Sequence, residues 1–495
     1  MERLFGTDGI RGKVGVYPLT EEMIFNIGRA AALYAKEENI HNRKSQRISI
    51  AKDTRTSGEM FEEQLIKGIT SVGVDAIKLG ILPTPCSAYL VKKQNYDMGI
   101  VISASHNDIS DNGLKFFTHK GYKLSLQEEE EIEGLIAAET RGSDKTTQDS
   151  GREESVSALS QEEDISKTIE TEGAAAESEE PQVAQPDNDI TPEGKEKDEP
   201  KAMELYTALL KELTAGDDIS KYKIAIDCAY GAASHLIPHI VKELGLNVVT
   251  VSDTPNGDNI NAESGSLHPN VVSEVVIKEA CDCGFAFDGD GDRVIACDER
   301  GQILDGDFIL AIIAKYLSDR DLLNKKTIVT TQMSNLGLEM CVNQRGERLV
   351  KTDVGDKYVL EKMIKGKYNL GGEQSGHIIL LDHTTTGDGI LTALFMLKIM
   401  AEEGKSLKEL SRCMYKFPQV LVNINVKHKK PIEEVPKLQK AISKCEKKLG
   451  SSGRLYVRYS GTEDKLRIMI EGQNQVQINE LAEEVACLAK EELNA

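Results

Sequence analysis

Met98-Gly-Ile-Val-Ile-Ser-Ala-Ser-His-Asn107 is an apolar run that ends abruptly in a polar loop. The apolar part is typical of a buried β-strand, and similar runs occur at residues 47–51, 222–227, 284–287 and 327–331. Stretches with helical periodicity separate these runs, and the alternation predicts α/β domains with mostly parallel sheets. Such sheets bind ligands beyond the carboxyl ends of their strands, so functional residues are expected in the polar loops that follow.

The chain is 495 residues long, which is too long for one hydrophobic core, so several domains are expected. Beyond about residue 415 the pattern changes. Residues 419–427 alternate between apolar and polar, and residues 454–458 and 466–470 do so around a turn that contains glycine. Two alternating runs around such a turn predict an antiparallel hairpin, here in a smaller α+β domain.

Residues 142–200 differ from the rest of the chain. They contain no aromatic residue and four prolines, and their 18 Asp and Glu against 5 Lys and Arg account for −13 of the net charge of −21. A segment of this composition buries too little apolar area to offset its chain entropy, so it is predicted to be a disordered linker.

Composition also limits the partners and the compartment. A net charge of −21 argues against an exposed nucleic-acid site, because phosphate backbones are held by clustered Lys and Arg. The nine cysteines are scattered without a C-x-x-C pair, which indicates a reducing compartment. The N-terminus has no apolar leader and no apolar run is long enough to span a bilayer, so a cytoplasmic protein that does not bind membranes is predicted. No oligomeric state follows from these patterns.

The loop Ser103-Ala-Ser-His-Asn107 carries a candidate nucleophile. Ser105 lies beside His106 and Asn107, which could position a proton acceptor for its hydroxyl. Asn112-Gly-Leu-Lys115 brings a cation, Lys115, to the same region. The alternatives are a turn or helix cap for the serines and an ordinary Asn-Gly turn.

Asp288-Gly-Asp-Gly-Asp-Arg293 is the strongest local signal. Asp288, Asp290 and Asp292 alternate with glycine and can converge on one hard divalent cation. An EF-hand would place Glu299 at its last ligand position, but it needs glycine where Arg293 stands and helices where apolar, strand-like residues flank the loop. Three carboxylates beside an arginine favour Mg²⁺ with open positions for phosphate oxygens, against a purely structural turn.

Two further loops fit the two ends of a sugar phosphate. Gly371-Gly-Glu-Gln-Ser-Gly-His377 offers Glu373, Ser375 and His377 to sugar hydroxyls, unless it is only a polar hairpin loop. In Arg458-Tyr-Ser-Gly-Thr-Glu463 the backbone can form an anion-binding turn, and Arg458 and Arg467 can clamp a phosphate, unless this is a plain surface hairpin. A nucleophile, a metal site, a sugar-binding loop and a phosphate clamp together predict a phosphosugar mutase.

These motifs resemble those of the α-D-phosphohexomutases, and within that family the bacterial branch that acts on glucosamine phosphates. The resemblance begins at Arg3-Leu-Phe-Gly-Thr-Asp-Gly-Ile-Arg-Gly12 and includes the four loops in the order of the family. It continues in Thr384-Thr-Thr-Gly-Asp-Gly-Ile-Leu-Thr-Ala-Leu394 and leaves out residues 142–200. The resemblance implies three similar α/β domains with mixed or parallel sheets and a smaller C-terminal α+β domain around a central cleft. The predicted bounds are 1–141 for domain 1, 142–201 for the linker, 202–300 for domain 2, 301–415 for domain 3 and 416–495 for domain 4.

The resemblance also implies roles for individual residues. Ser105 would be carried as phosphoserine and would complete, with the three aspartates, the shell of one Mg²⁺ per subunit. Arg11, Lys115, His106 and Arg293 match positions that place charges around the phosphoserine, with Lys115 and His106 as candidates for proton transfer. The matching sugar-binding residues are Glu373 and Ser375, residues 352–357 resemble a further substrate loop, and the matching phosphate clamp consists of Arg458, Ser460, Gly461, Thr462 and Arg467.

The expected reaction converts glucosamine 6-phosphate to glucosamine 1-phosphate through a sugar bisphosphate that turns over in the cleft, with domain 4 rotating over it. The expected preference for glucosamine depends on Gln374, because the glutamine between Glu373 and Ser375 resembles the branch that acts on glucosamine phosphates. Asp108, Tyr459 and Asp464 stand where the family usually has proline, which puts the turnover rate in doubt. The alternatives are a mutase of broader specificity for glucose or mannose phosphates and a non-catalytic phosphosugar sensor.

Overall fold

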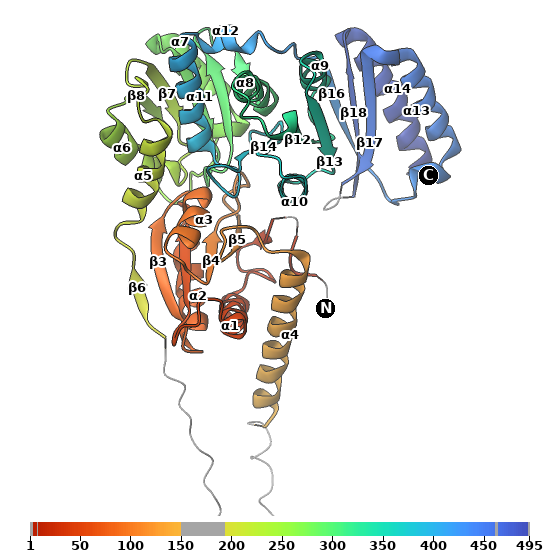
Figure 1. The fold of residues 1–495 in the computed structure, drawn as a ribbon. Helices are drawn as coiled ribbons and strands as arrows, with labels where there is room; N and C mark the ends of the chain where they lie inside the picture. Colours follow the sequence, from red (N-terminus) through yellow and green to blue (C-terminus); the bar gives the residue numbers. More distant parts are fainter. Residues whose placement is uncertain (1–2, 7, 150–193, 461–463, 494–495) are drawn as a thin grey trace, which may run out of the picture.

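A computed structural model describes the backbone of residues 3–6, 8–149, 194–460 and 464–493. This part of the chain contains four β-sheets, each with its own helices (Figure 1). Three are α/β domains and the fourth is a smaller α+β domain, which confirms the predicted fold class. Within the described residues, no helix combines the length and apolar character that a membrane span requires.

Domain 1 contains a mixed sheet of six strands in the order β1-β5-β4-β2-β3-β6. The central strands are parallel, and β1 and β5 run antiparallel to their neighbours. Alternate side chains of the strands point to opposite faces, so Ile48 and Ile50 pack toward α1 and α2 while Ala51 joins a second core. The strands are β1 (Ile10–Lys13), β2 (Arg47–Lys52), β3 (Asp75–Ile81), β4 (Met98–Ile102), β5 (Asp111–Thr118) and β6 (Glu196–Asp198). The helices are α1 (Glu21–Glu38), α2 (Gly58–Thr70), α3 (Thr84–Lys93) and α4 (Leu126–Asp149).

Domains 2 and 3 repeat this plan with fewer strands. The sheet orders are β11-β10-β9-β7-β8 and β13-β12-β14-β15, with parallel centres and antiparallel edges at β10, β11 and β15. Domain 2 contains β7 (Lys223–Asp227), β8 (Asn247–Val251), β9 (Cys283–Phe287), β10 (Val294–Asp298), β11 (Ile303–Leu304), α5 (Ala202–Leu213), α6 (Ala233–Leu244) and α7 (Asn270–Glu279). Domain 3 contains β12 (Thr327–Thr331), β13 (Arg348–Thr352), β14 (Leu370–Gly372), β15 (Ile378–Leu380), α8 (Gly306–Asp319), α9 (Leu336–Gln344), α10 (Asp356–Gly366), α11 (Gly389–Glu403) and α12 (Leu407–Ser411).

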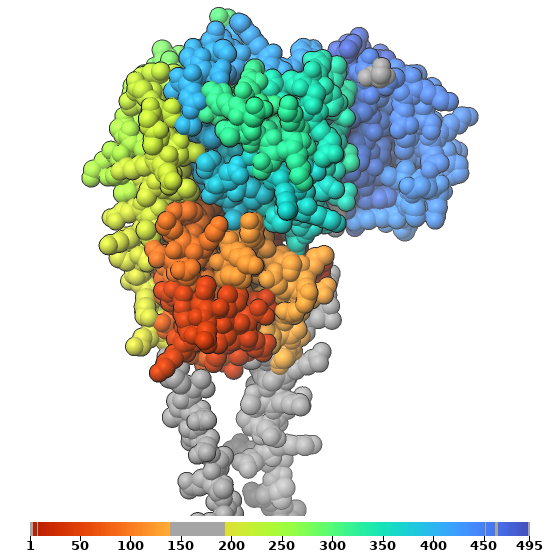
Figure 2. Space-filling model, in the orientation of Figure 1, coloured from red at the N-terminus to blue at the C-terminus, as the bar shows by residue number. Residues whose placement is uncertain are grey.

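Domain 4 is an antiparallel sheet in the order β16-β18-β17, covered by two helices. The antiparallel pairing of β17 and β18 confirms the predicted hairpin of the two alternating runs. The elements are β16 (Gln419–Asn425), α13 (Pro436–Leu449), β17 (Gly453–Tyr459), β18 (Lys465–Gly472) and α14 (Gln475–Leu493). Figure 2 shows this domain projecting to one side of the other three.

One continuous core joins the first three domains. It contains α3 from domain 1, α5 and α6 from domain 2, and α8 and α11 from domain 3. Domain 4 has its own core, formed by its sheet and its two helices. Domains 1 to 3 are therefore held together by buried apolar contacts, and domain 4 is an appended unit.

The structure differs from the prediction at both ends of the segment predicted to be disordered. Helix α4 continues to Asp149, and residues 196–198 form β6, which pairs in parallel with β3. Residues 150–193, the middle of that segment, lie outside the described residues. The sheet of domain 2 also takes in β11, whose residues 303–304 follow the predicted boundary at 300.

Candidate active site

Ser105 lies in the loop after β4, at the carboxyl end of a central strand of domain 1. Its side chain is buried, and its Oγ donates a hydrogen bond to Oδ2 of Asp288 in domain 2 at 2.6 Å. Nδ1 of His106 lies 3.2 Å from the same hydroxyl. Ser105 has a φ of 53°, which residues other than glycine adopt rarely and which concentrates at functional sites. The structure thus brings the predicted nucleophile to the predicted metal loop.

Asp288, Asp290 and Asp292 lie in the loop that joins β9 and β10. All three are buried, and each offers a carboxylate oxygen within 4.8 Å of the others. Glycine allows this loop to meet the serine loop, because a Cβ added to Gly289 would lie 2.7 Å from the carbonyl oxygen of Ser105. A larger residue at position 289 would push the two loops apart.

The electrostatics of the triad favour a bound cation. Burial and the charges of Asp292 and Asp290 raise the pKa of Asp288 well above its usual value. Oδ1 of Asp290 is buried and has no hydrogen-bond partner among the described residues. A hard divalent cation would relieve both the repulsion and the missing contact. The residues therefore fit a metal ion.

The EF-hand alternative is excluded by the surroundings of the loop. Strands β9 and β10 flank it, where an EF-hand needs helices. Glu299 accepts a hydrogen bond from Oγ of Ser406 at 2.8 Å, next to the start of α12. The backbone N–H of Arg293 donates to Oδ1 of Asp288 at 3.0 Å, so position 293 closes the loop without a glycine.

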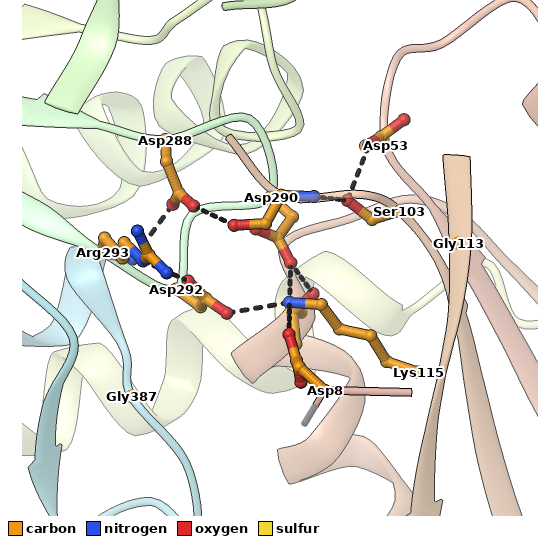
Figure 3. Close-up of polar contacts among 12 residues, drawn as sticks. Asp8, Asp53, Ser103, Gly113, Lys115, Asp288, Asp290, Asp292, Arg293 and Gly387 are labelled. Atoms are coloured by element: carbon orange, nitrogen blue, oxygen red, sulfur yellow. Dashed lines mark hydrogen bonds and ion pairs between the residues drawn. The ribbon is translucent and has the colours of Figure 1, made fainter. Parts of the chain in front are cut away.

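Lys115 on β5 brings a buried cation from domain 1 to the same point (Figure 3). Its Nζ lies 2.6 Å from Oδ2 of Asp290, 2.9 Å from Oδ2 of Asp292 and 3.3 Å from Oδ2 of Asp8. Burial alone would lower the pKa of Lys115, but the three aspartates outweigh it and raise the pKa well above the usual value. Lys115 therefore stays positively charged against the metal loop.

A ring of alternating charges extends this cluster to domain 3. Lys123 forms ion pairs with Asp8 and with Asp356 at the start of α10. Nε2 of His377 lies 3.4 Å from Oδ2 of Asp356, and its Nδ1 lies 3.6 Å from Oδ1 of Asp292. The sequence singled out the stretches that contain Asp8 and Asp356, but nothing in it pointed to Lys123.

Some residues of the loop between β14 and β15 line the cleft and others do not. Among the described residues, those that line the cleft include Glu373 and His377 but not Gln374 or Ser375. Oε1 of Glu373 accepts the backbone N–H of Gly355 at 3.2 Å, and burial raises the pKa of Glu373 above its usual value. The amide of Gln374 donates to Asp305 at 3.4 Å, and Ser375 is exposed.

Strands β17 and β18 each present an arginine to the cleft. Arg458 and Arg467 are direct cross-strand partners, which concentrates positive charge at this point of the sheet. Nη2 of Arg467 lies 3.4 Å from Oγ of Ser460, and Nε of Arg458 has no hydrogen-bond partner among the described residues. Gly461 and Thr462, also predicted for this clamp, lie outside the described residues.

A cleft of about 570 Å³ is lined by Asp292 of the triad and by both arginines, whereas Ser105, Lys115, Asp288 and Asp290 are not among its described lining residues. All four domains contribute to its walls, which confirms the predicted central cleft. The predicted residues that line it are Arg11, His106, Asp292, Arg293, Glu373, His377, Arg458, Ser460 and Arg467.

Each of the three departures from the usual prolines has local partners. Oδ1 of Asp108 accepts the backbone N–H of Ser110 at 3.0 Å and so closes the turn after the serine loop. The hydroxyl of Tyr459 donates to the carbonyl of Lys430 at 2.6 Å. Asp464 forms an ion pair with Lys429. These contacts replace part of the rigidity that proline would supply.

A serine hydroxyl against an acidic triad, beside a cleft that Asp292 of the triad and two arginines line, defines a class of enzyme: one that transfers a phosphoryl group on a small anionic substrate. Comparison with known families agrees. Four domain models of the phosphoglucomutase/phosphomannomutase family match this chain. They are α/β/α domain I at residues 2–143, α/β/α domain II at 204–301, α/β/α domain III at 305–417 and the C-terminal domain at 421–488. The chain belongs to this family, the α-D-phosphohexomutases.

Among curated proteins, the chain is 44% identical to a phosphoglucosamine mutase of Pelobacter propionicus over 100% of this chain and 99% of that protein. It is 45% identical, with the same coverage, to a phosphoglucosamine mutase of Geobacter metallireducens. Among solved structures, a phosphoglucomutase/phosphomannomutase family protein of Burkholderia thailandensis has a TM-score of 0.73 at 20% identity, covering 99% of this chain and 98% of that one. An N-acetylphosphoglucosamine mutase of Aspergillus fumigatus, in complex with GlcNAc-6P and magnesium, has a TM-score of 0.63 at 17% identity, covering 99% and 96%.

Proposed function

We propose that this protein is a phosphoglucosamine mutase, which interconverts glucosamine 6-phosphate and glucosamine 1-phosphate. One observation carries the proposal: Oγ of Ser105 lies 2.6 Å from Asp288 of a buried aspartate triad, and another member of that triad, Asp292, lines a cleft that also presents a pair of arginines. A mutase has to hold its substrate at both ends, because a phosphate leaves one sugar oxygen while another arrives elsewhere. The names of the full-length relatives support glucosamine as the sugar.

The reaction runs through phosphoserine at position 105. The P–O bond to Ser105 breaks while a new P–O bond forms to the free hydroxyl of the sugar phosphate, which gives a sugar bisphosphate. The bisphosphate turns over in the cleft, and its other phosphoryl group returns to Oγ of Ser105. The attacking hydroxyl must lose its proton, and the negative charge that develops on the serine oxygen must be balanced. We assign the first task to His106, which contacts the serine hydroxyl, and the second to the positively charged Lys115, which contacts the triad.

Positively charged groups around Ser105 can stabilise the negative charge that spreads over the phosphoryl oxygens during transfer. Mg²⁺, held by the three aspartates and a phosphoserine oxygen, would neutralise the developing negative charge. Arg11 and Arg293 line the cleft beside the triad and can bind further phosphoryl oxygens. Burial and the charges of Arg293 and Arg11 lower the pKa of His106 to about 4, so its imidazole is neutral near pH 7.

Substrate recognition uses the remaining walls of the cleft. Arg458, Arg467 and Ser460 bind the phosphate that is not being transferred, and Glu373 accepts hydrogen bonds from sugar hydroxyls. Gln374 donates to Asp305, outside the cleft wall, which favours a second candidate: a mutase that also accepts glucose or mannose phosphates.

We further propose a cytoplasmic location, because all nine cysteines are free thiols, as in a reducing compartment.

The decisive experiment compares kcat/KM for the 6-phosphates of glucosamine, glucose and mannose, with Mg²⁺ and a trace of sugar bisphosphate. The glucosamine substrate is expected to give the highest value. Similar values for all three would favour the broader mutase. The absence of turnover with every hexose phosphate would refute the proposal, and a non-catalytic sensor would then also lack phosphate at Ser105 in intact-mass analysis.

Removing one arginine of the clamp is expected to weaken substrate binding. In Arg458→Gln the phosphate loses a charge-assisted hydrogen bond of roughly 1.5–3 kcal/mol, so KM should rise about 10- to 100-fold with a smaller change in kcat. Steady-state kinetics measure both constants. The control is Lys440→Gln, which removes one positive charge from an exposed position on α13 in the same domain. Equal KM values for the two variants would show that Arg458 does not bind the phosphate.

A further inference from the structure

Arg55 lies in the polar loop after β2 and makes an unusual set of contacts. Its side chain is fully buried. Its Nη1 donates to the carbonyl oxygens of Asp108 at 2.6 Å and Asp111 at 3.0 Å, and its Nη2 donates to those of Ser105 at 3.2 Å and Asn107 at 2.9 Å. One guanidinium group thus satisfies four carbonyls of the loop that carries Ser105.

Asp53, the ion-pair partner of Arg55, also contacts the loop that carries Ser105. Nε of Arg55 donates to Oδ2 of Asp53 at 3.0 Å, and the same oxygen accepts the hydroxyl of Ser103 at 2.6 Å. The hydroxyl oxygen of Ser103 in turn accepts the backbone N–H of Ser105 at 2.9 Å. The pair of Asp53 and Arg55 therefore fixes both the N–H and the carbonyl of Ser105.

Domain 2 adds a second donor to the same carbonyls. Nδ2 of Asn261 lies 2.8 Å from the carbonyl oxygen of Ser105 and 3.2 Å from that of Asn107. This is the peptide next to the left-handed φ of Ser105, a conformation that persists only where its surroundings fix it. These hydrogen bonds supply that constraint, and they come from residues that do not line the cleft among those described.

We propose that Arg55 is a positioning residue for phosphoryl transfer: it holds the Ser105 loop so that the serine oxygen faces the aspartate triad. The proposal rests on the function proposed above. Arginine is required because its planar fork offers five donors in fixed directions, whereas lysine offers a single ammonium that cannot reach four carbonyls and a carboxylate in the same geometry. Arg55 acts through the loop and does not touch the substrate.

Arg55→Lys tests the proposal while keeping the charge. Because displacement of a reacting group by about 1 Å can cost 10²-fold in rate, kcat is expected to fall roughly 10²-fold. The KM for glucosamine 6-phosphate should stay near that of the wild type, since the residues of the cleft wall are untouched. The matched control is Arg47→Lys at the start of β2, the strand that precedes the loop of Arg55, where Arg47 also donates to backbone carbonyls, those of Gln94 and Asn95. This control is expected to keep the wild-type kcat.

Asn261→Ala is the second variant, in case Arg55→Lys folds poorly. It removes the other donor to the carbonyls of Ser105 and Asn107 and should also lower kcat without raising KM. A wild-type kcat in a folded Arg55→Lys protein, or an equal loss in Arg47→Lys, would overturn the positioning role and leave the proposed function intact. If Arg55→Lys does not fold, an unchanged kcat in Asn261→Ala would overturn it. The absence of turnover in the wild type would refute the proposed function and this inference together.

Discussion

Replacing Ser105 with alanine is expected to lower kcat for glucosamine 6-phosphate by roughly 10⁴-fold or more. The phosphoryl group then has no oxygen to return to, and the neighbouring groups can only bind the substrate. The clamp of Arg458 and Arg467 and the carboxylate of Glu373 remain, so binding should stay measurable by calorimetry. Intact-mass analysis of the wild type should show one phosphoryl group that the variant lacks.

Ser110→Ala is the matched control for this prediction. Ser110 is an exposed serine of the same loop, and its removal leaves the contacts between Ser105 and Asp288 in place. It should retain turnover and the phosphoryl group. Turnover close to that of the wild type in Ser105→Ala would show that another group accepts the phosphoryl, and the mechanism through phosphoserine would be wrong.

The strands that carry the site could be predicted because their signal is local. The runs predicted at residues 98–102 and 327–331 are β4 and β12 with the same bounds, and the other three differ by one residue. Each is a central strand that is buried at every position or at all but the first, which favours short runs rich in apolar and β-branched side chains. By contrast, β6 is exposed at all three positions and has no apolar pattern. It exists because its backbone pairs with β3 and so forms the edge of the sheet, which a local pattern cannot reveal.

The functional site likewise combines features with a local signal in the sequence and features that depend on tertiary contacts. The serine and aspartate loops were recognisable because each concentrates reactive side chains in a few residues. The contact between Ser105 and Asp288 joins two domains and became visible only in the fold. Lys123 and Arg55 were missed because their partners are far away in sequence or are backbone carbonyls, which carry no side-chain signature. The orientation of Gln374 toward Asp305 likewise depends on tertiary contacts.

Asp288→Asn is expected to separate metal binding from folding. In the metal-free protein, burial and two neighbouring aspartates raise the pKa of Asp288 well above its usual value, so a neutral side chain of the same shape should cost little stability. Mg²⁺ should stabilise the wild type by about 2.7 kcal/mol at 100 times its Kd, and the variant by much less at the same concentration. Because the metal contributes several kcal/mol to catalysis, kcat should fall roughly 10³-fold. Thermal unfolding with EDTA or with Mg²⁺, together with kinetics, measures these effects.

Glu299→Gln is the control because Glu299 would be a metal ligand only in an EF-hand. In the structure it accepts a hydrogen bond from Ser406, and the amide oxygen of glutamine can accept the same bond. Its response to Mg²⁺ should therefore equal that of the wild type. If Mg²⁺ stabilises Asp288→Asn as much as the wild type, the aspartate triad does not hold the metal. If Glu299→Gln loses the response instead, the ion is bound near Glu299, beyond β10, and the arrangement around Ser105 would need a different source of positive charge.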